Sequence, residues 1–243
     1  MQIDAAIIGG TGIGDRLLAL GGKPLHVPTR EGTVRGRVVS IEGRSVFLAS
    51  RHSAGHKVPP HRVNYRAVAL ALQALRVRAC FSTAAVGSLR ADWPRGTFAV
   101  PHDFLDVTAR NVTLFEHTVV HTDFGAPFAP SARQALLRGA AAAGAEARDG
   151  GVYVCGNGPR YETLFEIDLY KKAGGDVVGM TAATEAIVMR EAGVPYACLC
   201  VVTNLAAGME AEALDHEDVV REMNRAGVRA VEVLQHAVAG LEP

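Results

Sequence analysis

Short apolar segments alternate with longer alanine-rich segments along this 243-residue chain, and this alternation constrains the fold most. The apolar segments have the length of buried strands, and the alanine-rich segments have the length of helices. Strands that alternate with helices are typical of α/β domains with a mostly parallel sheet. The expected strands are 5–8, 37–41, 45–49, 79–82, 97–100, 151–155, 177–179 and 197–202, and the expected helices are 65–75, 131–143, 160–173, 184–192 and 215–239.

The segment 35–49 reads as a hairpin, which adds an antiparallel pair to the sheet. We therefore expect a central mixed sheet flanked by helices. No internal repeat, low-complexity segment or linker interrupts the chain, and its 49% hydrophobic residues suffice for a sizeable core. The sequence predicts a single α/β domain over residues 1–243.

The charge balance argues against two classes of partner. The chain has 25 Lys and Arg and 25 Asp and Glu, whereas nucleic-acid grooves and proteins of anionic membrane surfaces usually carry a basic excess. We expect no nucleic acid and no membrane as partners, since no apolar run approaches the roughly 18 residues of a membrane span. The four cysteines lie in strand-like segments without metal-ligand spacing. This favours buried reduced thiols, a cytoplasmic protein and no metal site.

Ligands of α/β sheets bind at the carboxyl ends of the strands, and the first such end is Gly9-Gly10-Thr11-Gly12. Its glycines let backbone N–H groups approach an anion, and Thr11 adds a hydroxyl. The spacing does not fit a dinucleotide-binding loop, because Asp15 and Leu17 stand where a third glycine is needed. A simple tight turn is the alternative.

Three further strand ends suit the same anion. Arg51 and His52 follow a strand, and the planar fork of an Arg can bind two phosphate oxygens. The small residues around Ala85 expose backbone N–H groups, and Thr181 adds a second hydroxyl. A solvated loop at Arg51 and a close-packed crossover at Ala85 are the alternatives. Together these strand ends predict an anion clamp.

A second group of residues suits a planar ring with polar edges. Gly158-Pro159 ends a strand and a helix is expected to begin near Arg160, which places Tyr161 and Glu162 in its first turn. There the helix dipole would keep Glu162 ionised. Asn204 follows another strand and offers a donor and an acceptor. The alternatives are a carboxylate that stabilises a helix start and an Asn that caps a turn. Without a cofactor or metal motif, the pattern favours a reaction in which the anion is itself a reactant.

Seven short motifs occur in a specific order: Gly9-Gly10-Thr11-Gly12, Arg51-His52, Val63-Asn64-Tyr65, Gly87-Ser88-Leu89, Gly158-Pro159-Arg160, Gly179-Met180-Thr181 and Glu185-Ala186. Together they resemble the trimeric purine nucleoside phosphorylase and methylthioadenosine phosphorylase family, over nearly the whole chain. The resemblance implies a single α/β domain with a mixed sheet. It also implies reversible phosphorolysis of a purine N-glycosidic bond, which gives the free base and a pentose 1-phosphate without a cofactor.

The resemblance also assigns roles to residues. The phosphate site would comprise the Thr11 hydroxyl, Arg51, His52, the Ala85 backbone N–H and Thr181. Met180 would lie against the ribose, and Tyr161 would pack on the purine face. The pattern Tyr161-Glu162-Thr163 with Thr203-Asn204 is similar to the 6-oxopurine branch, since adenine-type members carry a small residue at the first site and Asp at the second. The catalytic residues would be Asn204, Glu162 and Arg51.

The chemistry of the bases agrees with that branch. Hypoxanthine and guanine present an N1–H group that the Glu162 carboxylate can accept, whereas N1 of adenine is an acceptor and would be repelled. The Asn204 amide can donate to O6 and accept from N7–H as the base leaves. A site built on such hydrogen bonds rejects a mismatched base strongly. The expected activity is therefore cleavage of inosine and guanosine.

Two histidines complete the resemblance. A His at the position of His216 reaches the ribose 5′-hydroxyl in the 6-oxopurine branch, whereas methylthio-specific members carry an apolar residue there. His121 matches a loop that reaches a neighbouring subunit's site, which implies a homotrimer or a hexamer of paired trimers. The alternatives are the same reaction on 5′-methylthioinosine or 5′-methylthioadenosine, a non-catalytic nucleoside-binding protein, and a dinucleotide-dependent dehydrogenase.

Overall fold

The computed structural model describes residues 2–53, 57–210 and 215–242. Its strands are β1 (Ala5–Gly9), β2 (Lys23–Thr29), β3 (Gly32–Ile41), β4 (Arg44–Ser50), β5 (Ala79–Ser88), β6 (Phe98–Val100), β7 (Asp103–Asp106), β8 (Ala147–Asp149), β9 (Val152–Cys155), β10 (Val177–Gly179) and β11 (Tyr196–Leu205). Its helices are α1 (Gly14–Leu18), α2 (Tyr65–Ala74), α3 (Pro130–Ala142), α4 (Leu164–Lys172), α5 (Ala182–Glu191) and α6 (His216–Ala239), and Pro60–Arg62 forms a 3₁₀ turn.

All these strands join one mixed sheet with β5 at its centre. The main path runs β2-β3-β4-β1-β5-β10-β9-β7, and β11 leaves it by pairing with β5 and with β6, which pairs with β8. Strands β4, β1, β5 and β11 are mutually parallel, whereas the β2–β3, β3–β4, β5–β10 and β6–β11 pairs are antiparallel. The expected mixed sheet is confirmed, and the carboxyl ends of its parallel strands meet at one edge.

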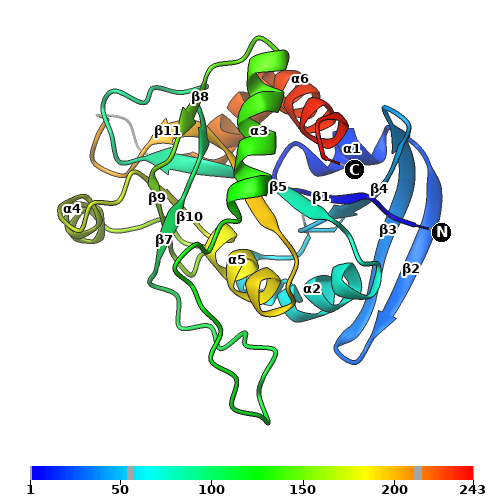
Figure 1. Cartoon of the computed structure of the whole chain (residues 1–243). Helices are drawn as coiled ribbons and strands as arrows, with labels where there is room; N and C mark the ends of the chain where they lie inside the picture. Colours follow the sequence, from blue (N-terminus) through cyan, green and yellow to red (C-terminus); the bar gives the residue numbers. More distant parts are fainter. Residues whose placement is uncertain (1, 54–56, 211–214, 243) are drawn as a thin grey trace.

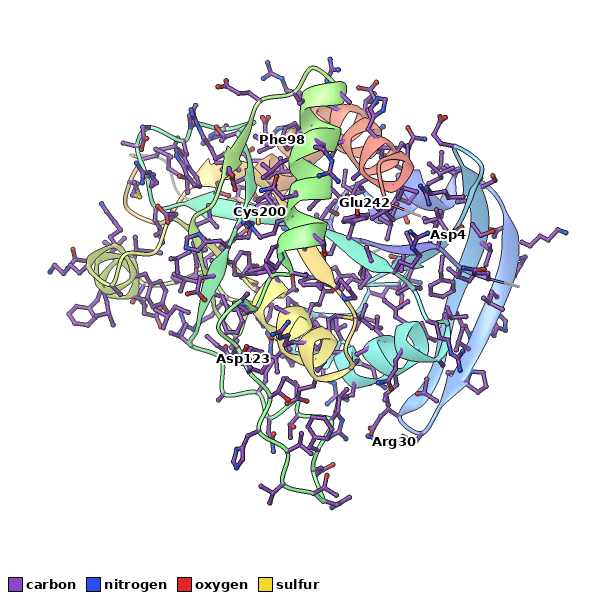
Figure 2. All side chains as sticks on the ribbon, in the orientation of Figure 1. Asp4, Arg30, Phe98, Asp123, Cys200 and Glu242 are labelled. Atoms are coloured by element: carbon purple, nitrogen blue, oxygen red, sulfur yellow. The ribbon has the colours of Figure 1, made fainter. Side chains whose placement is uncertain are left out.

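Helices cover both faces of this sheet (Figure 1). Helices α1, α3 and α6 pack on one face, where Leu17, Leu136 and Leu234 share a core with the sheet. Helices α2 and α5 pack on the other face, where Leu72 and Met189 lie in a second core. A smaller cluster buries one side of α4 against β9 and β10. Figure 2 shows side chains filling these layers, with Arg30 at the rim of the molecule.

Three strands and one helix were not predicted, and each is short or polar. Strand β2 has the sequence KPLHVPT and a single buried residue, so it lacks a clear alternation of apolar and polar positions. Strands β7 and β8 have four and three residues and are partly or fully exposed. Helix α1 has only five residues. Neither apolar periodicity nor length could separate such segments from loops.

The start of α4 corrects the sequence prediction. The helix begins at Leu164 rather than near Arg160, so Tyr161 and Glu162 lie in the loop before it. Thr163 is the N-cap residue: its hydroxyl accepts from the Glu166 N–H at 3.2 Å, and the Glu166 carboxylate accepts from the Thr163 N–H at 2.7 Å. This reciprocal pair is a capping box, and its Thr-x-x-Glu pattern is visible in the sequence.

Candidate active site

A cavity of about 380 Å³ lies where the parallel strands end, a size within the range of small-molecule sites. Among the residues that line it are ten of the predicted site residues: Thr11, Arg51, His52, Ala85, Tyr161, Glu162, Met180, Thr181, Asn204 and His216. The lining also contains Lys57, Val86 and Val219, which were not predicted as site residues. Segments far apart in the sequence thus form one pocket.

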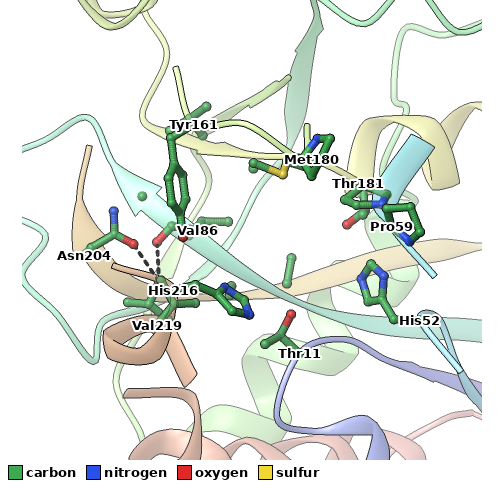
Figure 3. A pocket seen from close by; sticks show the side chains of 18 of the residues that line it. Thr11, His52, Pro59, Val86, Tyr161, Met180, Thr181, Asn204, His216 and Val219 are labelled. Carbon is green, nitrogen blue, oxygen red and sulfur yellow. Dashed lines mark hydrogen bonds between the residues drawn. The ribbon is translucent and has the colours of Figure 1, made fainter. Parts of the chain in front are cut away.

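The two predicted groups lie at opposite ends of this pocket. Figure 3 shows Thr11, His52 and Thr181 at one end and Tyr161 with Asn204 at the other. Met180 lies between them on one side of the pocket and His216 on the other. The hydroxyl and imidazole groups suit a small anion, and the ring with its neighbouring amide suits a planar polar ligand.

The glycine turn after β1 packs closely against β5. A Cβ atom on Gly10 would lie 2.4 Å from the Thr83 carbonyl oxygen, so only glycine fits there. The Gly10 N–H donates to the Thr83 hydroxyl at 3.0 Å. Gly12 has a φ of 71°, a conformation that glycine adopts without strain. This turn brings Thr11 to the pocket.

Arg51 forms a buried, bidentate ion pair with Glu185. Its Nε and Nη2 atoms donate to the two carboxylate oxygens at 2.6 and 2.8 Å, and Nη1 donates to the Thr83 carbonyl at 2.9 Å. The two side chains are only 2% and 3% exposed. Burial alone would lower the pKa of Arg51, but Glu185 more than offsets it and the pKa is raised. Of the five N–H groups of a guanidinium, these contacts leave two for a ligand.

Glu185 is the main structural residue that the site predictions lacked. Its carboxylate also accepts from the Tyr196 hydroxyl at 2.6 Å, and Tyr196 in turn contacts the Ser82 hydroxyl at 2.7 Å. One signal was present in the sequence: Glu185 is a lone charge in the apolar stretch of α5, and buried charges need partners. The pair balances the buried charge of Arg51 and fixes the orientation of its guanidinium in the pocket lining.

The N-terminus of α5 presents the Thr181 hydroxyl to the pocket. Thr181 is the N-cap residue, yet its side chain makes no capping hydrogen bond. The backbone N–H groups of Thr181 and Ala182 donate instead to the buried Tyr153 hydroxyl, at 3.3 and 3.4 Å. Gly179 permits this arrangement, because a Cβ there would lie 2.2 Å from that hydroxyl oxygen. Tyr153 thereby holds the backbone at the start of α5, and the Thr181 hydroxyl remains without a capping bond.

His52 is held by the loop that follows it. Its Nδ1 atom lies 2.7 Å from the Val58 carbonyl oxygen, and a carbonyl can only accept, so Nδ1 carries a proton. The Val58 N–H donates back to the His52 carbonyl at 3.0 Å. These two bonds orient the imidazole at the anion end of the pocket (Figure 3).

The Asn204 amide is fixed by a break in the ladder of β11. The register between β5 and β11 shifts between Val202 and Asn204, and such bulges redirect side chains. The Thr203 hydroxyl lies 2.9 Å from Asn204 Oδ1, and Asn204 Nδ2 donates to the Leu205 carbonyl at 2.8 Å. An amide has two donors and two acceptor sites. One of each therefore remains for a ligand.

The surroundings of Glu162 differ from the sequence prediction. Because α4 begins at Leu164, two residues after Glu162, this carboxylate lies outside the first turn and the helix dipole does not hold it ionised. Burial instead raises the pKa of Glu162. Arg160, the nearby cation, binds the Glu166 carboxylate at 2.7 and 2.8 Å. The Glu162 carboxylate lies against Gly156, where a Cβ would approach Oε1 to 2.7 Å. It is a partly desolvated acceptor at the edge of the pocket.

The two histidines of the sequence prediction have different positions. His216 is the first residue of α6, after the N-cap Asp215, and lines the pocket. His121 is exposed and is not among the pocket residues. It belongs to residues 107–129, here called the 107–129 loop, which connects β7 to α3 and extends from the body of the molecule (Figure 1). His121 can therefore not be placed in this chain's own pocket.

Within residues 2–53, 57–210 and 215–242, no group of three or more His, Cys, Asp or Glu side chains is placed to hold a metal ion. No helix of the described chain has both the length and the apolar character that a membrane crossing requires.

Comparisons with known proteins agree with this geometry. Residues 4–239 match the family model of the phosphorylase superfamily. A probable 6-oxopurine nucleoside phosphorylase of Moorella thermoacetica is 40% identical over 97% of this chain and 92% of its own length. A probable S-methyl-5′-thioinosine phosphorylase of Methanopyrus kandleri is 37% identical over 99% of this chain and 93% of its own length.

Solved structures give the same result for the fold. A methylthioadenosine phosphorylase from Schistosoma mansoni, in complex with adenine, superposes with a TM-score of 0.93 at 29% identity. The match covers 100% of this chain and 93% of that one. The family resemblance seen in the sequence motifs is thereby confirmed: this protein is an enzyme that belongs to the phosphorylase superfamily.

Proposed function

We propose that this enzyme cleaves the N-glycosidic bond of 6-oxopurine nucleosides, inosine and guanosine, with inorganic phosphate as co-substrate and no cofactor. The proposal rests on one pocket that is lined by Glu162 and Asn204 as well as by Thr11, His52 and Thr181. Figure 3 shows Asn204 and Tyr161, the residue before Glu162, at the end away from the three anion-end residues. A carboxylate and a fixed amide in the lining of the same pocket would match the N1–H, O6 and N7 edge of these bases. The four cysteines are buried and free, which favours a cytoplasmic location for the enzyme.

The phosphate end would aim the nucleophile. Thr11, Thr181 and the Ala85 N–H would donate to phosphate oxygens, and Arg51 would contribute its two remaining N–H groups. The Arg51–Glu185 pair is rigid, so these donors would need no reorganisation during the reaction. One phosphate oxygen would attack C1′ while the others stay bound, which converts an encounter in solution into a positioned reaction.

The base end would stabilise the leaving group. As the C1′–O bond to phosphate forms, the C1′–N9 bond breaks and its electron pair moves onto the purine. The proton of the hydrogen phosphate ends on the base, whose N7–H would donate to Asn204 Oδ1. Asn204 Nδ2 would donate to O6, and the Glu162 carboxylate would accept from N1–H, with Tyr161 against the ring.

The pocket lining near the expected ribose 5′ position supports a second candidate class of substrate. His216 can donate to a 5′-hydroxyl, but Val219 lies one helical turn further along α6 and also lines the pocket. An apolar neighbour of this kind suits a methylthio group, and one relative carries the name of a methylthioinosine phosphorylase. The base contacts are the same for inosine and 5′-methylthioinosine, so they do not separate these two.

The active form would be a homotrimer, alone or paired into a hexamer. The 107–129 loop exposes Val119 (86% exposed), and α4 exposes Phe165 (78%) with Leu164 and Leu169 beside it. These are two different apolar regions of the surface, and a contact between different regions builds a ring when its rotation closes, rather than a two-fold dimer. In such a ring the loop would bring His121 to the pocket of the neighbouring subunit.

A side-by-side assay tests the proposed substrates. Inosine, guanosine, adenosine, 5′-methylthioinosine and 5′-methylthioadenosine are each incubated with enzyme and phosphate, and the free base is quantified by chromatography. We expect phosphate-dependent release of hypoxanthine and guanine and little release of adenine. Faster cleavage of 5′-methylthioinosine than of inosine would favour the second candidate. Release of adenine as fast as hypoxanthine would contradict the role given to Glu162 and Asn204.

A further inference from the structure

Arg110 makes a cluster of contacts that the reaction described above does not use. It lies in the 107–129 loop, and its Nη1 atom donates to the Met180 carbonyl and the Thr184 hydroxyl, both at 2.9 Å. Its Nε atom donates to Asn157 Oδ1 at 3.1 Å, and its Nη2 atom donates to the Asn157 carbonyl. The guanidinium also lies over the Tyr65 ring, 5.6 Å from its centroid, with Nη1 3.3 Å from the Tyr65 hydroxyl.

The partners of Arg110 are the segments that form one wall of the pocket. Met180 and Pro159 line the cavity, and Asn157 directly precedes the Gly158-Pro159 pair that leads to Tyr161 and Glu162. These segments touch each other, since a Cβ on Gly158 would lie 2.5 Å from the Met180 sulfur. Tyr65 extends the cluster by donating to the carbonyl of Pro60, another pocket residue, at 2.8 Å.

The phosphate end of the pocket is held by other contacts. Arg51 is fixed by Glu185 and the Thr83 carbonyl, and the glycine turn is fixed by Thr83. The contacts recorded for Arg110 involve neither of these groups. Of the proposed anion donors only Thr181 adjoins an Arg110 partner, because it directly follows Met180. Loss of the Arg110 bonds would therefore free the Met180 wall and the Asn157 loop more than it would disturb the anion donors.

We propose that Arg110 is a positioning residue that fixes the nucleoside side of the pocket, by joining the turn at Met180 to the loop at Asn157. Its guanidinium contacts two backbone carbonyls and three side-chain oxygens at once, which a smaller or uncharged side chain cannot do. Arg110 acts through Met180 and the Tyr161–Glu162 segment and does not touch the substrate. The inference rests on the proposed phosphorolysis.

The test compares Arg110→Gln with wild type by steady-state kinetics, varying inosine and phosphate separately. We expect the KM for inosine to rise by about 10-fold, the change associated with a lost hydrogen bond to a charged group. The KM for phosphate should rise less than the KM for inosine, because among the proposed anion donors only Thr181 adjoins an Arg110 partner. The inosine KM of Arg110→Lys should lie between those of wild type and Arg110→Gln, because the lysine ammonium can reach only some of the acceptors.

Arg30→Gln is the matched control. Arg30 also anchors the 107–129 loop, through a bond of 2.9 Å to the Leu114 carbonyl, but it lies outside the pocket lining. The Leu114 N–H is held independently by Glu191 at 2.6 Å. Arg30→Gln should leave both KM values unchanged, which separates a general effect of the loop from the effect of Arg110.

Thr184→Val tests the same cluster if Arg110→Gln does not fold. It removes one acceptor of Arg110 and keeps the shape of a buried side chain, and it should raise the inosine KM more than the phosphate KM. An equal rise in both KM values in the folded variants, or no rise in either, would overturn the inference. A wild-type enzyme that cleaves no purine nucleoside would instead refute the proposed function, so the two failures are distinguishable.

Discussion

The surroundings of Glu162 and Asn204 differ: hydrogen bonds orient the Asn204 amide, whereas burial raises the pKa of the Glu162 carboxylate. The Asn204 amide is oriented by Thr203 and the Leu205 carbonyl, so its remaining donor and acceptor have fixed directions. The Glu162 carboxylate is held in partly buried surroundings that raise its pKa, and Arg160 is engaged with Glu166. An ionised Glu162 therefore lowers the stability of the free enzyme, and a ligand N–H group would relieve this.

Asn204→Asp should change the preference between bases. The substitution replaces the amide donor at O6 by an acceptor, which suits the exocyclic amine of adenosine. We expect the ratio of kcat/KM for inosine over adenosine to fall by about 10- to 100-fold, as for one hydrogen bond to a charged group. Asn224→Asp, at an exposed site on α6, is the control and should leave the ratio unchanged. The same ratio in both variants would exclude Asn204 from base recognition.

Arg51→Ala is a less selective test of the site. It would remove a proposed phosphate ligand and also leave the Glu185 carboxylate buried without its cation, which is strongly destabilising. A loss of activity in this variant could therefore come from either effect.

Glu162→Gln should alter the pH profile. Because burial raises the pKa of Glu162, the wild-type carboxylate is protonated, and loses its acceptor function for N1–H, at a higher pH than an ordinary glutamate. The kcat/KM for inosine should fall as the pH falls through that raised pKa. In Glu162→Gln this acid limb should disappear, with neutral-pH activity about 10- to 100-fold lower.

The same substitution should lower the activity but raise the stability of the folded enzyme. The folded state binds the Glu162 proton more tightly than the unfolded state does, so ionisation at neutral pH costs stability. Glu162→Gln should therefore raise the melting temperature at neutral pH, and the gain should vanish at acidic pH. An unchanged acid limb together with a lower melting temperature would contradict both roles of Glu162.

At the scale of elements, the residues at the strand ends were predictable from the sequence, but the contacts between elements were not. The glycine turn, Arg51-His52, Met180-Thr181 and Asn204 all follow apolar strands that are clear in the sequence. The Arg51–Glu185 pair joins residues 134 positions apart, and local patterns carry no information about such a contact. The bulge before Asn204 arises from the pairing of β5 with β11 and is equally invisible. The wrong start of α4 came from reading Gly-Pro as the helix boundary instead of the capping box.

Tyr153→Phe tests how β9 supports the start of α5. The Tyr153 hydroxyl accepts from two backbone N–H groups. Without this hydroxyl, both N–H groups would be buried and would lack this hydrogen bond. We expect a loss of about 1–3 kcal/mol in unfolding free energy, the usual cost of an unsatisfied buried group, measured by urea unfolding. The phosphate KM should also rise, because the Tyr153 hydroxyl holds the backbone that carries Thr181. A variant with wild-type stability and wild-type phosphate KM would show that Tyr153 only fills space.

At the scale of the whole molecule, the two ends of the pocket are supported by different kinds of segment. The phosphate end is built on strand ends and a buried ion pair, whereas the nucleoside end is built on loops tied together by Arg110. The exposed apolar residues on α4 and on the 107–129 loop lie outside both. In the proposed trimer they would lie between subunits, where the 107–129 loop would reach a neighbouring pocket.

Subunit mixing tests this shared site. His121→Ala would lack the loop contact and Asn204→Ala would lack the base contact, so each variant alone should be weakly active. Mixed trimers, made by co-expression, should regain activity because some pockets combine an intact Asn204 with a neighbour's intact His121. Phe165→Asp should dissociate the trimer, whereas Val228→Asp, on the exposed side of α6, should not. A fully active monomer in sedimentation would contradict the shared site.

The most direct test follows the oxygen atoms of phosphate. Inosine is incubated with the enzyme and oxygen-18-labelled phosphate, and the sugar product is examined by mass spectrometry. If phosphate attacks C1′, the product is ribose 1-phosphate that retains every labelled oxygen, and no hypoxanthine forms when phosphate is omitted. Free ribose as the product, or hypoxanthine release that does not depend on phosphate, would contradict phosphorolysis.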